Sequence, residues 1–449
     1  MHEPTVRWHS TLHIALLHPT RAALLMQPEN GVWALPQVQG EGRMPLRQVA
    51  FTNQMMAQVF GLHTTVLRYL DVRETSGHCE AIGLLEAHDP TWQPPPAWQW
   101  MTDSDLDTLL LRVPEHRQCL RACMQELARD TPPYPPCPWT HTGWFARVEA
   151  WIDHELGRLG QMRVAPLAQV SSWSLSCVLR ARTMTGQVYC KALPPILAHE
   201  PVLLQVLSAH DAIHIPQPLA IQPEEGWMLL ADFGPDLRGT TERQVWYDAL
   251  RTFAAFQRAS AGYVETLRTH GCPHRPLQSL PAAFATLLHD MAALTGLAET
   301  EVGQLCHLVP RVQQCCDELA AYQIPETIVH GDVHLGNMAN PQGHILFFDW
   351  TDGCVSHPFL DPVVMRSDTQ RLPDAAAMAE PLRQAYLAPW ATLESMPHLY
   401  DAWRLAGPLG AVHQAMNYYR ITTHMEAAHY PELTGGLQFW LRQVLRAFS

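Results

Sequence analysis

The sequence predicts an α+β protein of two domains that are separated by a proline-rich linker. Short strand-like runs surround one helical stretch before the linker, whereas a strand hairpin and later helical stretches follow it. Residues 130–141 contain repeated prolines, which have no backbone N–H to donate in a helix or in an inner strand. We therefore place the domain boundary there. With 449 residues, 47% of them hydrophobic, the chain is long enough to bury the cores of two or three domains.

Residues 1–129 form the first predicted domain. Apolar residues recur at helical spacing over Leu46–Phe60, and Gly61 is expected to end that helix. Four short apolar runs with the length of strands flank the helix: Leu12–Leu17, Ala22–Met26, Leu67–Val72 and Ala81–Leu85. The order of two strands, one helix and two strands makes this domain α+β.

The surroundings of that helix resemble the signature box of the Nudix hydrolases. Trp33-Ala34-Leu35-Pro36 and Gly40 precede the helix, Gly61 follows it, and the interval between the two glycines agrees with the box. The charged positions of the box, however, carry residues that cannot hold divalent cations against a pyrophosphate: Leu46, Gln54, Met55, Gln58 and Val59. The resemblance therefore implies a Nudix-like domain without Nudix catalysis. An unrelated α+β domain with coincident glycines is the alternative.

Two apolar runs in residues 142–449 end in polar residues that can carry chemistry. Ile328–Val329 leads into a turn that contains Asp332 and Asn337, and Ile345–Phe348 ends in Asp349. These strand ends are expected to present three oxygen-bearing side chains together, which suits Mg²⁺ and a phosphate. Protein kinases use the same order of a base, a first metal ligand and a second metal ligand.

The complete pattern resembles the aminoglycoside phosphotransferase and choline kinase family. It consists of His330-Gly331-Asp332-x-His334-x-x-Asn337, then Asp349-Trp350 and His357-Pro358-x-x-Asp361. The resemblance implies a bilobal protein-kinase-like phosphotransferase fold, with a small lobe over about 142–235 and a large lobe over about 236–449. It also implies a role for six residues: Asp332 as the catalytic base, Asn337 and Asp349 as metal ligands, and His330, His334 and Asp361 as structural support of the catalytic loop.

The nucleotide is expected to bind through the small lobe. Lys191 ends the second strand of a predicted hairpin, 176–182 and 187–192, where kinase-like folds place the lysine that contacts the α- and β-phosphates. Glu200 is its expected partner because Pro201 suits a first helical turn. An exposed surface glutamate is the alternative interpretation of Glu200.

Two further segments complete the expected nucleotide site. Val170–Ser176 precedes the second half of the hairpin and is the expected phosphate-covering loop, although it has serines in place of a glycine pattern. Backbone groups near Leu230 and Ala231 are expected to bind adenine. The adjacent Asp232-Phe233-Gly234 spells the kinase magnesium tripeptide but lies far upstream of the catalytic loop, so the metal role is given to Asp349.

Charge and cysteine content restrict the partners and the compartment. The 43 acidic and 30 basic residues give a net charge of −13, which disfavours nucleic acid and anionic membranes. The N-terminus shows no leader pattern and no apolar run reaches the length of a membrane span, so a cytoplasmic protein is expected. The eleven scattered cysteines predict reduced thiols. His116, Cys119 and Cys123 share one helical face, but no second half at zinc-finger spacing exists, so inert buried thiols are expected.

The predicted function is ATP- and Mg²⁺-dependent transfer of a γ-phosphate to a small-molecule hydroxyl. Aminoglycosides, sugars, choline-like amines and amino-alcohols all fit this chemistry, and a cationic acceptor could lie beside Asp352 or Asp401 and against aromatic faces. Most of those aromatics are expected to be core residues: Trp390, Trp403, Tyr418, Tyr419 and Trp440. A non-catalytic nucleotide-binding regulator or scaffold is the alternative. The sequence does not indicate an oligomeric state.

Overall fold

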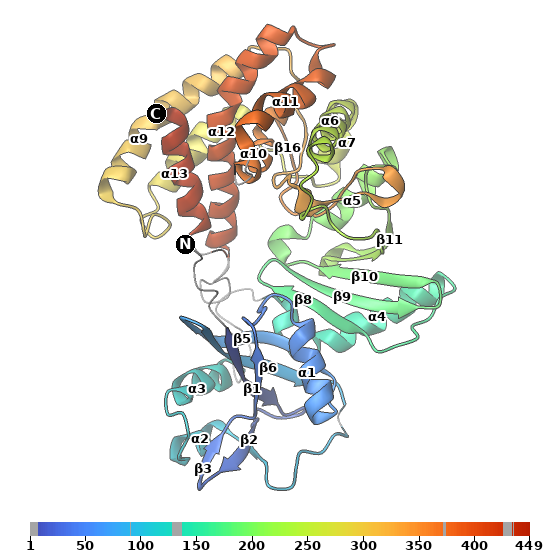
Figure 1. Cartoon of the computed structure of the whole chain (residues 1–449), viewed down its shortest axis with the longest axis vertical. Coiled ribbons are helices and arrows are strands. Elements are labelled where there is room, and N and C mark those ends of the chain that lie inside the picture. Colours follow the sequence, from blue (N-terminus) through green and yellow to red (C-terminus); the bar gives the residue numbers. More distant parts are fainter. Residues whose placement is uncertain (1–7, 90, 128–136, 371–373, 425–432, 434) are drawn as a thin grey trace. The chain divides into compact units, whose positions relative to one another are not determined.

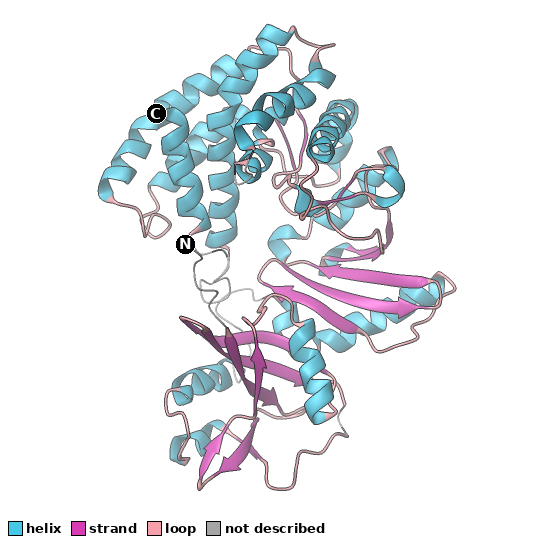
Figure 2. Cartoon of the chain, in the orientation of Figure 1, coloured by secondary structure: helices cyan, strands magenta, loops and turns pink. Residues whose placement is uncertain are grey.

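The computed structural model of the chain describes residues 8–89, 91–127, 137–370, 374–424, 433 and 435–449. The chain divides into two compact units, Met1–Pro194 and Pro195–Ser449 (Figure 1). Long strands predominate in the first unit and helices in the second (Figure 2). Residues 130–136 of the predicted linker lie outside the described residues. Its remainder contains the short 3-10 helix η1 (Pro138–Thr140).

A seven-stranded mixed sheet forms the core of the first unit. The central strand β1 (His9–Leu17) pairs in parallel with β6 (His78–Ala87), which in turn pairs antiparallel with β5 (Thr64–Thr75). The remaining strands pair antiparallel with their neighbours: β2 (Leu24–Glu29), β3 (Val32–Ala34), β4 (Gln37–Glu41) and β7 (Gln99–Met101). Three of the four predicted strands are confirmed with longer bounds, and the predicted strand Ala22–Met26 is found two residues later in the chain, as β2. The strands β3, β4 and β7 escaped prediction because three to five residues show no clear alternation.

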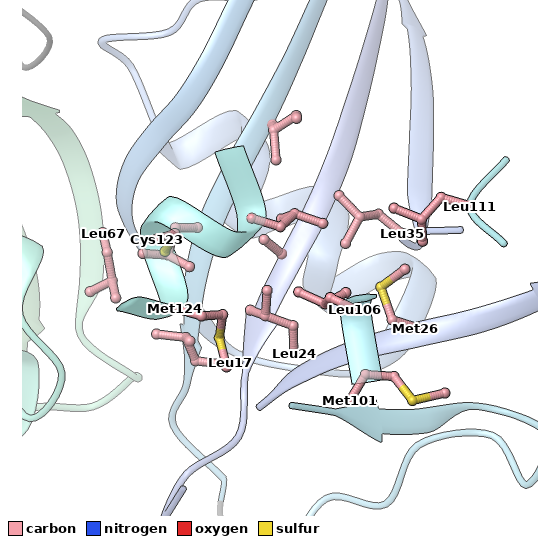
Figure 3. Close-up of a cluster of buried hydrophobic side chains, with 14 residues drawn as sticks. Leu17, Leu24, Met26, Leu35, Leu67, Met101, Leu106, Leu111, Cys123 and Met124 are labelled. Carbon is pink, nitrogen blue, oxygen red and sulfur yellow. The ribbon is translucent and has the colours of Figure 1, made fainter. Parts of the chain in front are cut away.

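Helices cover both faces of this sheet. Successive side chains of β1 point to opposite faces, so each face carries apolar residues that pack against helices. Ala15 and Leu17 share a buried cluster with residues of α2 (Asp103–Thr108) and α3 (His116–Leu127), which Figure 3 shows. Leu12, Ile14 and Leu16 belong to a second cluster that includes Met56 of α1 (Ala50–Phe60).

Helix α1 begins at Ala50, and the prediction that it begins at Leu46 is wrong. The Leu46 N–H donates to the Met44 carbonyl at 3.0 Å and the Gln48 N–H to the Pro45 carbonyl at 2.9 Å, so this segment forms turns. The predicted end is confirmed, since Gly61 has a φ of 62°, a left-handed conformation that glycine adopts readily.

The first unit continues past the linker with a helix and three antiparallel strands. These are α4 (Trp144–Arg158), β8 (Ala168–Trp173), β9 (Ser176–Thr183) and β10 (Gly186–Ala192). The predicted hairpin is confirmed as β9 and β10. The expected phosphate-covering loop forms most of β8 and its tight connection to β9.

Strand β8 is joined to the mixed sheet by the buried side chain of Gln169. Its Oε1 accepts from the Val66 N–H at 2.9 Å and from Asn53 Nδ2 at 3.1 Å, and its Nε2 donates to the Val66 carbonyl at 3.0 Å. The Arg47 guanidinium also stacks 3.5 Å from the centre of the Trp173 ring. These contacts join residues on the two sides of the proline-rich linker, where the sequence analysis places the domain boundary.

The second unit begins with α5 (Glu200–His210) and the hairpin of β11 (Pro218–Gln222) and β12 (Trp227–Ala231). Four short strands follow later in two antiparallel pairs: β13 (Thr327–Val329) with β16 (Cys354–Ser356), and β14 (Met338–Ala339) with β15 (Leu346–Phe347). The other helices are α6 (Arg243–Ser260), α7 (Val264–Thr269), α8 (Leu280–Leu288), α9 (Glu299–Ala320), α10 (Val363–Thr369), α11 (Ala375–Leu387), α12 (Met396–Thr423) and α13 (Gly436–Phe448).

The 28-residue helix α12 organises the helical part of the second unit. It packs against α8, α9 and α13 (Figure 1). Buried residues occur all around it, including Leu409, Val412 and Ala415. Among the described residues, none of the helices combines the length and the hydrophobicity that crossing a membrane requires.

Candidate active site

The loop 330–337 connects β13 to β14 and carries the predicted base. Pairing of Met338 with Phe347 places Asn337 beside Phe348, whose N–H donates to the Asn337 carbonyl at 3.0 Å. Asp349 follows Phe348 directly. The strand ends therefore bring the two polar segments together, as the sequence predicted.

Asp361 holds the beginning of this loop. Its two carboxylate oxygens accept from the N–H groups of His330 at 2.6 Å and Gly331 at 2.9 Å, and Gln257 Nε2 donates to one of them at 3.0 Å. The Tyr386 hydroxyl lies 2.6 Å from Gln257 Oε1 and orients that amide. Burial raises the pKa of Asp361 to about 7, and the two amide donors oppose this shift.

His330 fastens the loop to the segment that carries Asp349. Its Nδ1 accepts from the Asp332 N–H at 3.3 Å, so its Nε2 carries the proton and donates to the Phe348 carbonyl at 3.0 Å. Burial lowers the pKa of His330, which favours this neutral form. The tautomer is thus set by two backbone partners.

Gly331 lets the loop turn against the segment after Asp349. Its φ is +80°, and a Cβ at this position would approach the Asp352 Cβ to 2.6 Å and its carbonyl oxygen to 2.7 Å. Gln414 of α12 donates to the Gly331 carbonyl at 2.6 Å. Any larger residue at position 331 would have to displace backbone atoms.

The Asp332 carboxylate lies between His334 and Asn337, with 44% of the side chain exposed. His334 Nε2 is 3.4 Å from Asp332 Oδ2, and Asn337 Nδ2 donates to the same oxygen at 3.2 Å and to the Asp332 carbonyl at 3.0 Å. His334 Nδ1 accepts from the Gly336 N–H at 2.9 Å, which leaves its proton on Nε2, facing the carboxylate. Burial lowers the pKa of His334, but the hydrogen bond and charge of Asp332 outweigh this effect, so the pKa is raised.

Asp349 has a φ of +66°, a left-handed conformation that is uncommon outside glycine. Its Oδ1 accepts from the Thr351 hydroxyl at 3.1 Å. The next residue, Trp350, is fully buried, and its N–H donates to Glu200 Oε1 at 2.8 Å. Glu200 is itself buried at the start of α5, so the alternative of an exposed surface glutamate is wrong.

Asp352 adds a further carboxylate to this region. Burial raises the pKa of Asp352 to about 6, and the neighbouring Arg420 guanidinium, 3.3 Å away, opposes the shift. The charge of Asp332 raises the same pKa further. A negative charge on Asp332 and one on Asp352 therefore disfavour each other, and Arg420 compensates for part of this repulsion.

The predicted nucleotide-binding residues lie in both units. Lys191 is on β10 of the first unit, and Leu230 and Ala231 end β12 of the second, with Leu230 buried and Ala231 exposed. Asp232 is exposed, and its Oδ1 accepts from the Gly234 N–H at 2.9 Å. Asp232 thus stabilises its own turn, and the roles of the other three residues stay predictions.

The aromatic residues of the C-terminal helices are mostly core residues. Trp390 is fully buried and lies in edge-to-face contact with Phe359, and Trp403 and Trp440 are also buried. Tyr418 is only half-buried. Burial raises the pKa of Tyr418 to about 12, with added contributions from the charges of Asp332 and Asp352. The Tyr418 hydroxyl therefore interacts electrostatically with the carboxylates of Asp332 and Asp352.

Four residues that sequence reasoning missed support the site: Gln257, Tyr386, Gln414 and Arg420. They lie on three helices far from the motif in sequence, and a glutamine or tyrosine on an amphipathic helix carries no sign of its partner.

Comparison with known proteins identifies a phosphotransferase-family domain. Residues 192–399 match the sequence model of the phosphotransferase enzyme family. No curated protein matches the chain in sequence.

Several solved structures resemble the chain. The choline kinase of Streptococcus pneumoniae is 11% identical, covering 67% of this chain and 98% of its own, with a TM-score of 0.46. A macrolide 2'-phosphotransferase of Brachybacterium faecium is 17% identical, with 64% and 97% covered and a TM-score of 0.44. An aminoglycoside phosphotransferase of Streptomyces rimosus is 19% identical, with 60% and 97% covered and a TM-score of 0.40.

Proposed function

We propose that this protein transfers the γ-phosphate of ATP to a hydroxyl group of a small molecule. The observation that carries the proposal is the position of Asp332, a partly exposed carboxylate on a loop whose backbone is fixed by Asp361. Phosphoryl transfer needs little covalent help from the protein, so accurate positioning of such a group supplies much of the rate.

The chemistry of the donor set fits Mg²⁺. Asn337 uses its Nδ2 to donate to Asp332, so its Oδ1 is the atom that would bind a cation, and Asp349 offers a carboxylate on the adjacent strand end. Hard oxygen ligands of this kind suit Mg²⁺ bound together with nucleotide phosphates. The cation, when bound, would neutralise charge on the phosphate oxygens.

Asp332 would orient the acceptor hydroxyl and accept its proton. His334 presents an N–H to Asp332 Oδ2 and restricts the carboxylate to one orientation. The other oxygen, Oδ1, is then left to the acceptor. General-base assistance of this type contributes roughly 10²–10⁴-fold to a rate.

The nucleotide-binding roles follow the same proposal. Lys191 would contact the α- and β-phosphates, and the backbone near Leu230 and Ala231 would bind adenine. Glu200 would act through its hydrogen bond to Trp350 in positioning Asp349. Residues 142–449 would then form the phosphotransferase domain, and residues 1–129 a Nudix-like domain without hydrolase chemistry, since α1 contains no acidic residue.

The acceptor is expected to be a polar molecule with at least one hydroxyl. Aminoglycosides, sugars, choline-like amines and amino-alcohols are the classes to test first. An amino group on the acceptor would find negative charge at Asp332, whereas the nearby Asp352 already has Arg420 as its partner.

A screen for acceptor-dependent ADP release tests the proposal. The full chain is incubated with Mg²⁺, ATP and one compound of each class, with Asp332→Asn as the blank and Asp232→Ala as a matched control at an exposed aspartate. Release that depends on the acceptor and is lost only in Asp332→Asn supports the proposal. Tight Mg²⁺-ATP binding without turnover in all three proteins would favour the non-catalytic regulator instead.

A further inference from the structure

His13, Glu80 and His116 meet in the first unit, and none of them belongs to the candidate active site described above. Each offers a ligand atom, and these atoms all lie within 4.8 Å of one another. Both histidines are buried, whereas Glu80 is partly exposed. We propose that these three side chains bind a transition-metal ion of the Zn²⁺ class.

The fold brings the three residues together on rigid elements. In the parallel pairing of β1 with β6, Glu80 lies opposite Thr11 and His13 opposite Ile82, so His13 and Glu80 point to the same face of the sheet. This is the face that Ala15 and Leu17 share with α3 (Figure 3). His116 is the first residue of α3 and closes the cluster from above the sheet.

The ligand set has the composition that such an ion requires. Two imidazoles and one carboxylate form a common three-residue set for Zn²⁺, with a fourth position left for water or a ligand. His13 Nε2 and Glu80 Oε1 are 2.7 Å apart and share a hydrogen bond. A metal would replace that shared proton, and tetrahedral geometry with bonds near 2.1 Å would open the separation to roughly 3.4 Å. The exposed part of Glu80 gives the carboxylate room for this small movement.

The imidazole rings of His13 and His116 lie edge to face. The two ring centres are 4.6 Å apart with an interplanar angle of 71°.

A small cavity beside the two histidines would hold the fourth ligand. It is lined by His13 and His116 together with Gln37 and Arg112, and its volume is about 10 Å³. That is close to the minimum, on the order of 10 Å³, that one ordered water needs. Met26, Leu35 and Leu111 also line the cavity, and their apolar side chains offer no hydrogen bond to a water molecule.

The thiols near His116 are not part of the site. Cys119 Sγ donates to the His116 carbonyl at 3.1 Å, not to its ring, and Cys123 belongs to the apolar cluster below α3. The expectation of inert thiols stays a prediction. The sequence analysis considers Cys119 and Cys123 as partners of His116, whereas the fold brings His13 and Glu80 near its ring.

Metal titration of the full chain tests the proposal. Protein stripped with a chelator is titrated with Zn²⁺ by calorimetry and with Co²⁺ by visible absorption, whose d–d bands report tetrahedral nitrogen and oxygen ligation. One equivalent is expected to bind, and saturating Zn²⁺ should raise the melting temperature. His116→Ala should weaken the first equivalent by about a hundredfold or more, since even loss of a group that only supports a ligand costs roughly 10–100-fold.

Two more variants separate ligation from folding. Glu80→Gln keeps a hydrogen-bonding side chain beside His13 but removes the anionic ligand, so it should fold and bind Zn²⁺ more weakly. His398→Ala is the matched control, because His398 forms a 2.8 Å pair with Glu394 on the surface of the second unit. Absence of a stoichiometric first equivalent in the unaltered protein, or equal affinity in Glu80→Gln, His116→Ala and His398→Ala, would overturn the proposal and leave an ordinary hydrogen-bonded core histidine pair.

Discussion

The carboxylate of Glu200, 1% exposed, accepts a hydrogen bond from the backbone N–H of Trp350 at 2.8 Å. Trp350 follows Asp349, whose φ of +66° is a conformation that needs outside support. Glu200 also opens α5, where the partial positive charge of a helix N-terminus favours a carboxylate. One buried side chain therefore links the first helix of the second unit to the turn that presents a proposed metal ligand.

Replacing Glu200 with Leu should destabilise the protein and weaken Mg²⁺-ATP binding. An unsatisfied buried N–H costs about 1–3 kcal/mol, and the Asp349 turn would lose its anchor. Glu200→Gln retains an oxygen acceptor for the Trp350 N–H, so it should fold with a melting temperature close to that of the unaltered protein. Thermal melts and nucleotide titrations compare the two. Equal loss of stability in both variants would show that the charge, rather than the hydrogen bond, is what matters.

Replacing Asp332 with Asn should reduce transfer by about a hundredfold or more and leave Mg²⁺-ATP affinity nearly unchanged. The reason is that the variant loses the base but keeps the residues proposed to hold the cation. Single-turnover rates and equilibrium nucleotide binding are measured on the same preparation. Unchanged turnover would remove Asp332 from the mechanism.

Replacing Asp349 with Asn should instead weaken the Mg²⁺-dependent binding of the nucleotide. Asparagine tolerates the left-handed backbone at this position, so the fold is kept while the anionic ligand is lost. The Mg²⁺ concentration needed for half-maximal nucleotide binding should rise by tenfold or more. An unchanged Mg²⁺ requirement would contradict the assignment of Asp349.

The polar residues of the site were predictable because they form local patterns, whereas their supports were not. His330, Asp332 and Asn337 fall within one loop, and its flanking apolar runs indicate strands directly. The partner of the Trp350 N–H lies 150 residues away, and nothing in the Glu200 sequence environment distinguishes a backbone anchor from a lysine partner. The start of α1 was missed because turn hydrogen bonds before Ala50 override the helical spacing of apolar residues. Sequence patterns indicate which face of a helix or strand is buried and where that element ends. Hydrogen bonds between residues far apart in the sequence can be seen only in the folded structure.

His357 should make the protein less stable as the pH falls. Burial lowers the pKa of His357 to about 3, against about 6.5 in an unfolded chain. Between these values the unfolded state binds more protons, so the free energy of unfolding decreases with falling pH by up to about 1.4 kcal/mol per pH unit. His357→Asn keeps a cap acceptor for the Phe359 N–H, now provided by His357 Nδ1 at 3.2 Å, and removes the titrating ring.

Denaturant unfolding at several pH values between 7 and 4 measures this effect. The stability difference between the unaltered protein and His357→Asn should shrink as the pH is lowered. Asp361, whose pKa burial raises to about 7, contributes with the opposite sign, but it is present in both proteins and cancels in the difference. His307→Asn, at an exposed position on α9, is the control and should change the slope little. A constant difference across this pH range would contradict the prediction.

Gln169 should couple the mixed sheet to β8, so replacing it with Leu should destabilise the first unit. Leucine leaves the N–H and the carbonyl of Val66 without their buried partner. Each unsatisfied group costs about 1–3 kcal/mol of stability. Gln205→Leu, at an exposed position of α5, is the matched control and should stay within about 0.5 kcal/mol. The same argument predicts that a chain truncated to begin at Thr142 loses solubility or activity, because it exposes the side of β8 that contacts the mixed sheet through Gln169. Denaturant unfolding of the two variants and ADP release by the truncated chain are the measurements. A truncated chain with full activity would show that β8 keeps its conformation without the mixed sheet.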